Sequence, residues 1–210
     1  MDVDIHPFVA GPLETNTYLL SHRTDGWIID PAMGMGDVAR FIRSRRIELR
    51  RVLLTHGHGD HIAGIGELKR DWPGLKVFCP RAEAGMLTDP QANLSGAFGL
   101  DITAGAPDEL VEPGQTLQAG GLELLVLDTP GHTPGSVSYY CPAARAVFTG
   151  DALFAGSVGR SDLPGGDHTR LIESIRRSLL SLPDETVVLP GHGPSTTIGH
   201  ERRTNPFLLD

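Results

Sequence analysis

Cysteine is scarce in this sequence, and long apolar runs are missing. Only two cysteines, Cys79 and Cys141, occur among the 210 residues, and they form no C-x-x-C pair. Their spacing argues against a disulfide and against cysteine metal ligands, so we expect buried or free thiols. No apolar run approaches the roughly 20 residues that a membrane-spanning helix requires, and no membrane partner is expected.

An excess of basic residues is also missing. The chain carries 18 lysines and arginines against 26 aspartates and glutamates, a formal net charge of −8. A nucleic-acid-binding protein needs a basic face, so this balance argues against a nucleic-acid partner. Residues 1–6 lack the basic and apolar regions of a signal peptide, which predicts a cytoplasmic protein. No linker or low-complexity stretch divides the sequence, and one domain is expected over residues 1–210.

The most informative feature is the run THGHGDH at residues 55–61, which holds His56, His58, Asp60 and His61. At the His and Asp frequencies of this chain, such a pattern should arise by chance in roughly one chain in a thousand. The apolar run before it predicts a short buried strand, and the apolar spacing after it favours a helix. The motif is therefore expected on a strand-to-helix turn. Its imidazole and carboxylate groups are ligands that suit zinc.

Three further loops have the same construction, a short apolar strand followed by a turn rich in glycine or proline. These turns carry His132, Asp151 and His192. Ligands gather at the carboxyl ends of strands in sheets covered by helices, so the four loops should converge. Together they hold five histidines and two aspartates, which are too many ligands for one tetrahedral zinc ion. Two metal ions fit better, one with three histidines and one with two histidines and Asp60, with Asp151 and a water between them.

The sequence resembles the metallo-β-lactamase superfamily along nearly its whole length. The resemblance rests on the 55–61 motif, on PGHT, TGD and PGH at residues 130–133, 149–151 and 190–192, and on the opening segments 13–20 and 28–31. It implies an α/β fold, a four-layer αββα sandwich with the metal site at one edge of the sheets. It also implies the ligands: His56, His58 and His132 for one ion, Asp60, His61 and His192 for the other, and Asp151 as the bridge.

Within this superfamily, segments 159–167 and 199–208 look most similar to short glyoxalase II-like hydrolases. The resemblance implies a metal-dependent hydrolase in which a hydroxide held by two divalent ions attacks a small-molecule thioester or ester. Zinc is the expected metal, with iron or manganese as alternatives. Asp60 would be catalytic, holding the nucleophile or passing on its proton. The chain ends eighteen residues after His192, without the helical domain that grips glutathione in full glyoxalase II enzymes, so glutathione recognition should be weak.

Alternatives remain open at this point. Persulfide dioxygenases resemble this chain in fold and motifs but use one iron ion, which here would bind His56, His132 and Asp151, a facial set suited to oxygen chemistry. A lactonase-type hydrolase would use the same two-metal centre. A non-catalytic metal-binding protein is disfavoured by the complete ligand set. Arg160 is the candidate substrate-binding residue, and it either pairs with a substrate carboxylate or braces Asp162 within the fold.

The hydrophobic periodicity predicts mixed α/β order, with helix 168–181 the clearest and Asp167 or Thr169 as its cap. Residues 88–116 have no lasting periodicity and are expected to form a functional or a disordered loop. In that loop Phe98 and Leu100 either line a pocket or anchor the segment to the core, and we favour anchoring. Helices are expected near 36–46, 62–71, 80–88 and 168–181, and strands near 3–9, 16–22, 26–30, 51–54, 75–78, 122–128, 136–141, 146–149 and 186–189.

Overall fold

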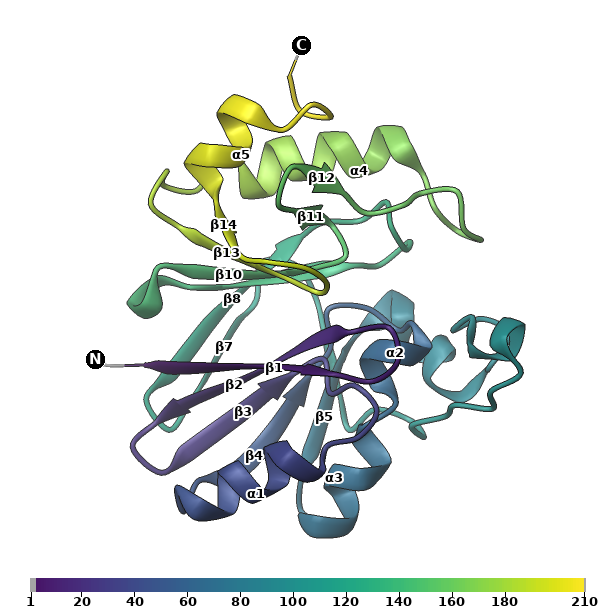
Figure 1. Cartoon of the computed structure of the whole chain (residues 1–210), viewed down its shortest axis with the longest axis vertical. Coiled ribbons are helices and arrows are strands. Elements are labelled where there is room, and N and C mark those ends of the chain that lie inside the picture. Colours follow the sequence, from purple (N-terminus) through teal and green to yellow (C-terminus); the bar gives the residue numbers. More distant parts are fainter. Residues whose placement is uncertain (1–2, 210) are drawn as a thin grey trace.

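Two mixed six-stranded sheets pack face to face, and helices cover the outer face of each (Figure 1). The structure is a computed structural model that describes residues 3–209, so residues 1, 2 and 210 of the expected domain lie outside the described residues. The arrangement is the four-layer αββα sandwich that the sequence predicts. In the described part of the chain, no helix has the length and apolar character needed to span a membrane.

The first sheet is antiparallel at its N-terminal side and parallel from β3 to β6. Its outer face is covered by α1 (Gly36–Ser44) and α3 (Ile65–Asp71). Central strands are buried on both faces because successive side chains alternate between two cores. In β2, Leu19 packs toward the helices, whereas Tyr18 and Leu20 pack toward the second sheet. The strands, in spatial order, are β1 (Asp4–Ala10), β2 (Thr15–His22), β3 (Asp25–Ile29), β4 (Glu48–Leu53), β5 (Lys76–Pro80) and β6 (Glu109–Val111).

The second sheet contains one parallel pair, β10 with β13, next to its β14 edge. Its outer face is covered by α5 (Ile198–Thr204) and by α4 (His168–Ser174), which continues as a π-helix over Ile175–Leu179. The Asp167 side chain caps α4 by accepting the Arg170 N–H at 3.0 Å, as one of the two predicted caps. The strands, in spatial order, are β14 (Thr196–Thr197), β13 (Val187–Pro190), β10 (Ala146–Gly150), β9 (Val137–Cys141), β8 (Leu122–Asp128) and β7 (Thr116–Ala119), with a separate ribbon of β11 (Leu153–Phe154) and β12 (Ser157–Val158).

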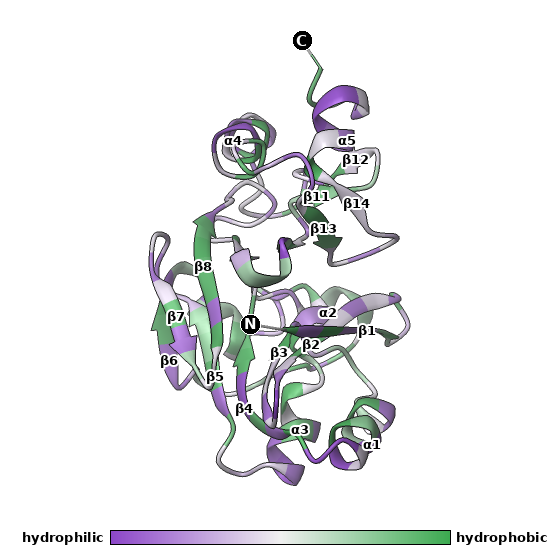
Figure 2. Ribbon diagram, turned by 90° about the vertical axis from the view of Figure 1, so that its left-hand side faces the viewer, coloured by the Kyte–Doolittle hydropathy of each residue, from purple (hydrophilic) through white to green (hydrophobic). Residues whose placement is uncertain are grey.

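The space between the sheets is filled by large apolar side chains from both. Trp27 and Leu53 come from the first sheet, and Tyr139 and Phe148 come from the second. All four side chains are fully buried. The apolar colour in Figure 2 accordingly follows strands such as β8 and β13. This shared core fixes the position of one sheet against the other, and therefore of the loops at their common edge.

All nine predicted strands are found, with small shifts at their ends, and the short strands β6, β7, β11, β12 and β14 and helix α5 were not predicted. The helix predicted over 62–71 is wrong in its extent. It is two helices, α2 (Gly59–Ile62) and α3, which are separated at Gly64. The Gly64 N–H donates to the Pro31 carbonyl at 2.9 Å, and a Cβ at this position would collide with the Ala32 carbonyl.

The predicted helix over 80–88 is a 3₁₀-helix, Arg81–Thr88. Both cysteines are free and buried, as expected.

Candidate metal centre

The predicted motif loops meet at one edge of the two sheets. The 55–61 loop follows β4 and leads into α2, so the expected strand-to-helix turn is confirmed. His132 follows β8, Asp151 follows β10 and His192 follows β13. These strands all end at the same edge, where backbone bonds also join the loops across the sheets. The Val137 N–H donates to the Thr55 carbonyl at 2.9 Å, and the Asn16 N–H of β2 donates to the Gly191 carbonyl at 2.7 Å.

The seven predicted ligands form two groups. In the first, the ring nitrogens of His56, His58 and His132 lie within 4.8 Å of one another, and His132 Nε2 is 2.9 Å from His58 Nδ1. In the second, Asp60 Oδ2 lies 3.4 Å from His61 Nε2 and 3.2 Å from His192 Nε2. Both groups have the composition that the resemblance implies.

The Asp151 carboxylate lies between the two groups. Its Oδ1 is 3.4 Å from His61 Nε2, and its Oδ2 is 3.7 Å from His132 Nε2 and 3.6 Å from His192 Nε2. One carboxylate therefore faces histidines of both groups, which is the position that a bridging ligand needs. The structure thus brings all seven predicted residues together, and the histidine and aspartate clusters are consistent with a dinuclear metal site.

Four of the five histidines have Nδ1 held by a group that is not one of the seven predicted ligands. In each case Nδ1 meets a hydrogen-bond partner, which turns Nε2 toward the common centre. Metal-binding histidines are typically fixed in this way by a partner on the second nitrogen. The pairs are His56 with the Thr55 hydroxyl at 3.0 Å, His61 with Asp30 Oδ2 at 3.0 Å, His132 with the Arg160 carbonyl at 2.7 Å, and His192 with the Leu13 carbonyl at 3.1 Å.

Three buried polar atoms at the centre of this cluster indicate that a metal fits. His56 Nε2, His61 Nε2 and Asp151 Oδ1 have no hydrogen-bond partner among the described residues. Buried polar atoms without a partner are rare, and each such atom needs an explanation. Imidazole nitrogen and carboxylate oxygen atoms are suitable ligands for zinc and iron, and coordination would satisfy all three.

The pKa values of the first group favour metal binding. Burial and the neighbouring imidazoles hold the pKa of His56 well below its ordinary value. Burial, together with His132 and His61, lowers the pKa of His58 to about 3. Both rings are therefore neutral near pH 7, which is the form of histidine that coordinates a metal.

The second group contains opposite charges that stabilise one another. Burial acts to lower the pKa of His61, but the carboxylates of Asp60, Asp151 and Asp30 raise it well above the ordinary value. For Asp60 the effect is reversed: burial acts to raise its pKa, and the histidines around it keep the pKa below its ordinary value. Ionised carboxylates at this position provide the negative charge that attracts a divalent cation.

Asp30 is a further residue of this candidate site, one that the sequence analysis did not single out. Its buried carboxylate accepts the Thr55 N–H at 2.8 Å and the Thr55 hydroxyl at 2.6 Å, and it also faces His61 Nδ1. Asp30 forms a third group with His56 and His61 that is compact enough for a metal. We assign it to positioning instead, because its oxygens are already used to hold the 55–61 loop. The sequence pattern that marks the other site residues also marks Asp30, because Asp30 directly follows the carboxyl end of β3.

Two residues at the start of β2 were also missed. The Thr15 hydroxyl donates to Asp60 Oδ2 at 3.0 Å. The Asn16 side-chain amide donates to the carbonyls of Pro190 at 2.9 Å and Gly193 at 2.8 Å, on either side of His192. Thr15 and Asn16 therefore link the first sheet to one ligand loop from each sheet. No local pattern marks these contacts, because in sequence they span 45 to 177 positions.

Glu83, on the 3₁₀-helix after β5, ties two of the ligand loops together. Its Oε2 accepts the Gly57 N–H at 3.0 Å, between His56 and His58, and its Oε1 accepts the Gly135 N–H at 2.7 Å in the loop of His132. The side chain is fully buried. Burial raises the pKa of Glu83, and the two backbone hydrogen bonds oppose that rise. Glu83 thus holds the loops of the first histidine group at a fixed separation.

Arg160, the predicted substrate-binding residue, lines the cavity beside the metal centre. Its guanidinium donates to Asp162 through Nε and Nη2, both at 2.9 Å, and both side chains are exposed. The pair with Asp162 is therefore found, but on the surface and not inside the fold.

Phe98 and Leu100 correct another expectation. They do not anchor the 88–116 segment, since they are 70% and 41% exposed and both line the same cavity.

Comparison with known proteins identifies the family. The family model described as the metallo-beta-lactamase superfamily matches residues 10–192. The chain belongs to this superfamily. Among curated relatives, it is 40% identical over 200 residues to the probable metallo-hydrolase YqgX of Bacillus subtilis, covering 95% of this chain and 94% of the relative. It is 36% identical over 211 residues to the hydroxyacylglutathione hydrolase GloC of Haemophilus influenzae, covering 99% of this chain and 98% of the relative.

Solved structures of the superfamily agree with the fold over almost the whole chain. The crystal structure of the BLEG-1 B3 metallo-beta-lactamase superposes with a TM-score of 0.94 at 38% identity, covering 99% of this chain and 100% of the other. The crystal structure of TTHA1623 in a di-iron-bound form gives a TM-score of 0.85 at 40% identity, covering 97% and 100%. This member of the metallo-beta-lactamase superfamily therefore has relatives that are named as hydrolases and as holding two metal ions.

Proposed function

We propose that this chain is a two-metal hydrolase that cleaves small thioesters or esters. The observation that carries the proposal is the Asp151 carboxylate, which faces both the group of His132 and the group of His61 and His192. Two ligand groups that share one carboxylate suit a pair of divalent ions. When bound, two such ions lower the pKa of a water to near 7 and polarise the substrate carbonyl.

The relatives support the proposal in two respects. The name of the relative GloC, hydroxyacylglutathione hydrolase, supports a thioester as the substrate class. The di-iron form of TTHA1623 supports a count of two metals and makes iron a candidate beside zinc. A β-lactam is the rival substrate class for the same centre, because the similar structure BLEG-1 is named as a B3 metallo-beta-lactamase.

The residues of the chain would orient the reactants and move one proton. Hydrolysis adds the hydroxyl of water to the carbonyl carbon and breaks the C–S or C–O bond. The proton of that water goes to the thiol or alcohol that leaves. Asp60 is placed for this transfer, because its Oδ2 is held by the Thr15 hydroxyl at 3.0 Å and the carboxylate lines the cavity. A carboxylate fixed at hydrogen-bonding distance is suited to accept a proton and release it.

The test combines metal analysis with a substrate panel. Protein expressed with zinc or with iron should approach two metal equivalents per chain. It should hydrolyse S-lactoylglutathione or a short thioester, and chelation should remove the activity. Asp151→Ala should lose at least one metal equivalent and most of kcat, because two nearby cations would lose the anion between them. Asp162→Ala, on the surface, is the matched control and should keep both metals.

Two results would replace the proposal. One metal equivalent that does not increase on adding metal, together with oxygen uptake on a glutathione persulfide, would favour the mononuclear iron dioxygenase. Two equivalents with turnover of lactones but not of thioesters would assign the same centre to a lactonase.

A further inference from the structure

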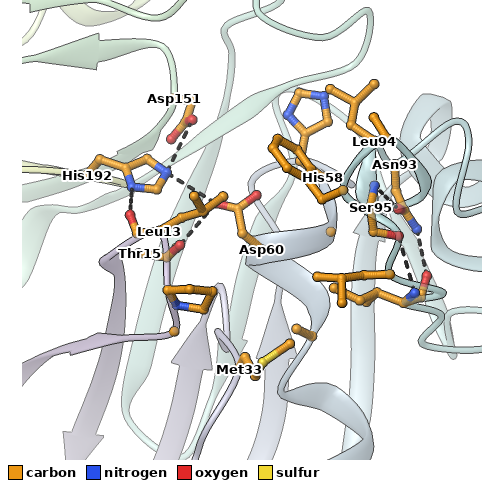
Figure 3. A pocket seen from close by; sticks show the side chains of 18 of the residues that line it. Leu13, Thr15, Met33, His58, Asp60, Asn93, Leu94, Ser95, Asp151 and His192 are labelled. Atoms are coloured by element: carbon orange, nitrogen blue, oxygen red, sulfur yellow. Dashed lines mark hydrogen bonds and ion pairs between the residues drawn. The ribbon is translucent and has the colours of Figure 1, made fainter.

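A cavity of about 670 Å³ opens directly above the metal centre. Five of the seven predicted ligands contribute to its lining, so a molecule bound there would have its reacting carbonyl next to them. Figure 3 shows Asp60, Asp151 and His192 on one side of this space and the segment of Asn93, Leu94 and Ser95 on the other. The ligands in its lining are His58, Asp60, His132, Asp151 and His192.

Much of the rest of the cavity wall is apolar, and four of its large apolar side chains are exposed. Phe98 is 70% exposed, Leu13 50%, Leu100 41% and Met33 37%, and all four line the cavity. They are four of the nine large hydrophobic side chains that are exposed in the described part of the chain. Single exposed apolar residues are common, but a group of them around one cavity indicates a binding surface.

Free positive charge is lacking from this wall. Arg160 is the only lysine or arginine among the described residues that line the cavity, and its guanidinium is already paired with Asp162. The carboxylates of a glutathione moiety would therefore find no unpaired lysine or arginine in the lining. Burying an unpaired carboxylate is costly, so the wall favours neutral groups.

The apolar wall is also held in place by its own hydrogen bonds. Asn93 is 1% exposed, and its side-chain amide donates to the carbonyls of Met86 at 3.0 Å and Ile102 at 2.9 Å. The Asn93 carbonyl accepts the Gly59 N–H at 2.8 Å, inside the 55–61 motif. The segment that carries Phe98 and Leu100 is thus fixed relative to the metal ligands. A wall that is ordered before binding loses little conformational entropy when a ligand arrives.

We propose that this cavity binds an apolar arm of a neutral ester or thioester, with the scissile carbonyl placed at the metal centre. The proposal rests on the hydrolase function proposed above and narrows its substrate class. The arm extends along Leu13, Phe98 and Leu100. It belongs either to the acyl group or to the leaving thiol, and the chemistry of the wall is the same for both.

The first experiment measures kcat/KM of the metal-loaded protein with two thioester series. One lengthens the acyl chain from acetyl to octanoyl on a constant small thiol, and the other lengthens the thiol on a constant acetyl group. Each buried methylene should raise kcat/KM by about two- to fourfold in one of the series. The octanoyl-to-acetyl ratio, or its thiol equivalent, should fall at least tenfold in Phe98→Ser. Phe207→Ser, which changes an exposed phenylalanine that does not line the cavity, should leave the ratio unchanged.

A binding measurement separates this proposal from the hydrolase function. Methyl ketones from five to eleven carbons carry the same neutral carbonyl and apolar arm but cannot be hydrolysed. Their Kd for the metal-free protein should fall by about twofold or more per methylene, and less in Phe98→Ser. Loss of turnover with this trend intact would reject only the hydrolase. Turnover of short thioesters with flat length dependence in both series and in ketone binding would overturn the apolar-arm proposal alone.

Discussion

At the scale of single residues, the site depends on partners that lie outside the histidine motif. Asp30 is the clearest case, because its carboxylate orients His61 and holds Thr55 by two hydrogen bonds. It adopts a left-handed backbone conformation with φ of 49°, which is uncommon outside glycine and best tolerated by aspartate and asparagine. A buried aspartate in this conformation, bonded to a candidate metal ligand, indicates that its position serves the site.

The change Asp30→Asn should weaken the second metal site. Asparagine keeps the shape and tolerates the backbone, but it replaces one acceptor oxygen by a donor and removes the charge that faces His61. Loss of such a partner typically lowers metal affinity about 10- to 100-fold. A competitive chelator titration should show this loss for one of the two ions and little change for the other. Asp162→Asn is the control, and unaltered affinity for both ions in Asp30→Asn would show that Asp30 has only a structural role.

At the scale of elements, a ligand loop from each sheet is joined to the other by one side chain on a third element. The 3₁₀-helix Arg81–Thr88 is short, yet its Glu83 accepts hydrogen bonds from a loop of each sheet. Two backbone N–H groups depend on this one carboxylate, the buried one of Gly57 and the partly buried one of Gly135. The helix therefore spaces the first histidine group, although it contributes no ligand.

Replacing Glu83 by alanine should destabilise the metal-free protein by about 1–5 kcal/mol, because the buried Gly57 N–H left without an acceptor costs about 1–3 kcal/mol and the partly buried Gly135 N–H adds a smaller cost. Glu83→Gln should cost less, since its amide oxygen still accepts one of the two bonds. Glu112→Ala is the matched control, because its exposed pair with Arg81 should contribute less than about 1 kcal/mol. Urea unfolding measures all three variants. Equal stability of Glu83→Ala and the control would contradict the bracing role.

The sequence predicts elements and ligands where the pattern is local, and it fails where contacts are distant. The four ligand loops are predictable because each places its histidine or aspartate directly after an apolar strand. Glu83 is not, because it stands 26 and 52 positions from the backbone groups that it binds. The 88–116 segment has no periodicity because its order comes from the buried amide of Asn93, not from an apolar face. For the same reason the exposure of Phe98 could not be foreseen.

At the scale of the whole molecule, the candidate site joins two halves. His56, His58, Asp60 and His61 belong to the half built on the first sheet, whereas His132, Asp151 and His192 belong to the half built on the second. Each ligand group draws members from both halves, so neither half carries a complete group. The core of Trp27, Tyr139 and Phe148 must hold the sheets together before the groups can form.

Metal binding should therefore stabilise the entire fold. A ligand that binds only the folded state adds about 4 kcal/mol at a free concentration of 1,000 Kd, which for a protein of this length corresponds to about 8–16 °C in Tm per site. Calorimetry on metal-free protein with added zinc should show one cooperative transition that moves upward as a unit, because the bound ions link both halves. Magnesium at the same concentration is the control and should have little effect, since it prefers all-oxygen ligands. Two separate transitions, with only one of them moved by zinc, would show that the metal ligands lie within one half and would refute a site shared between the sheets.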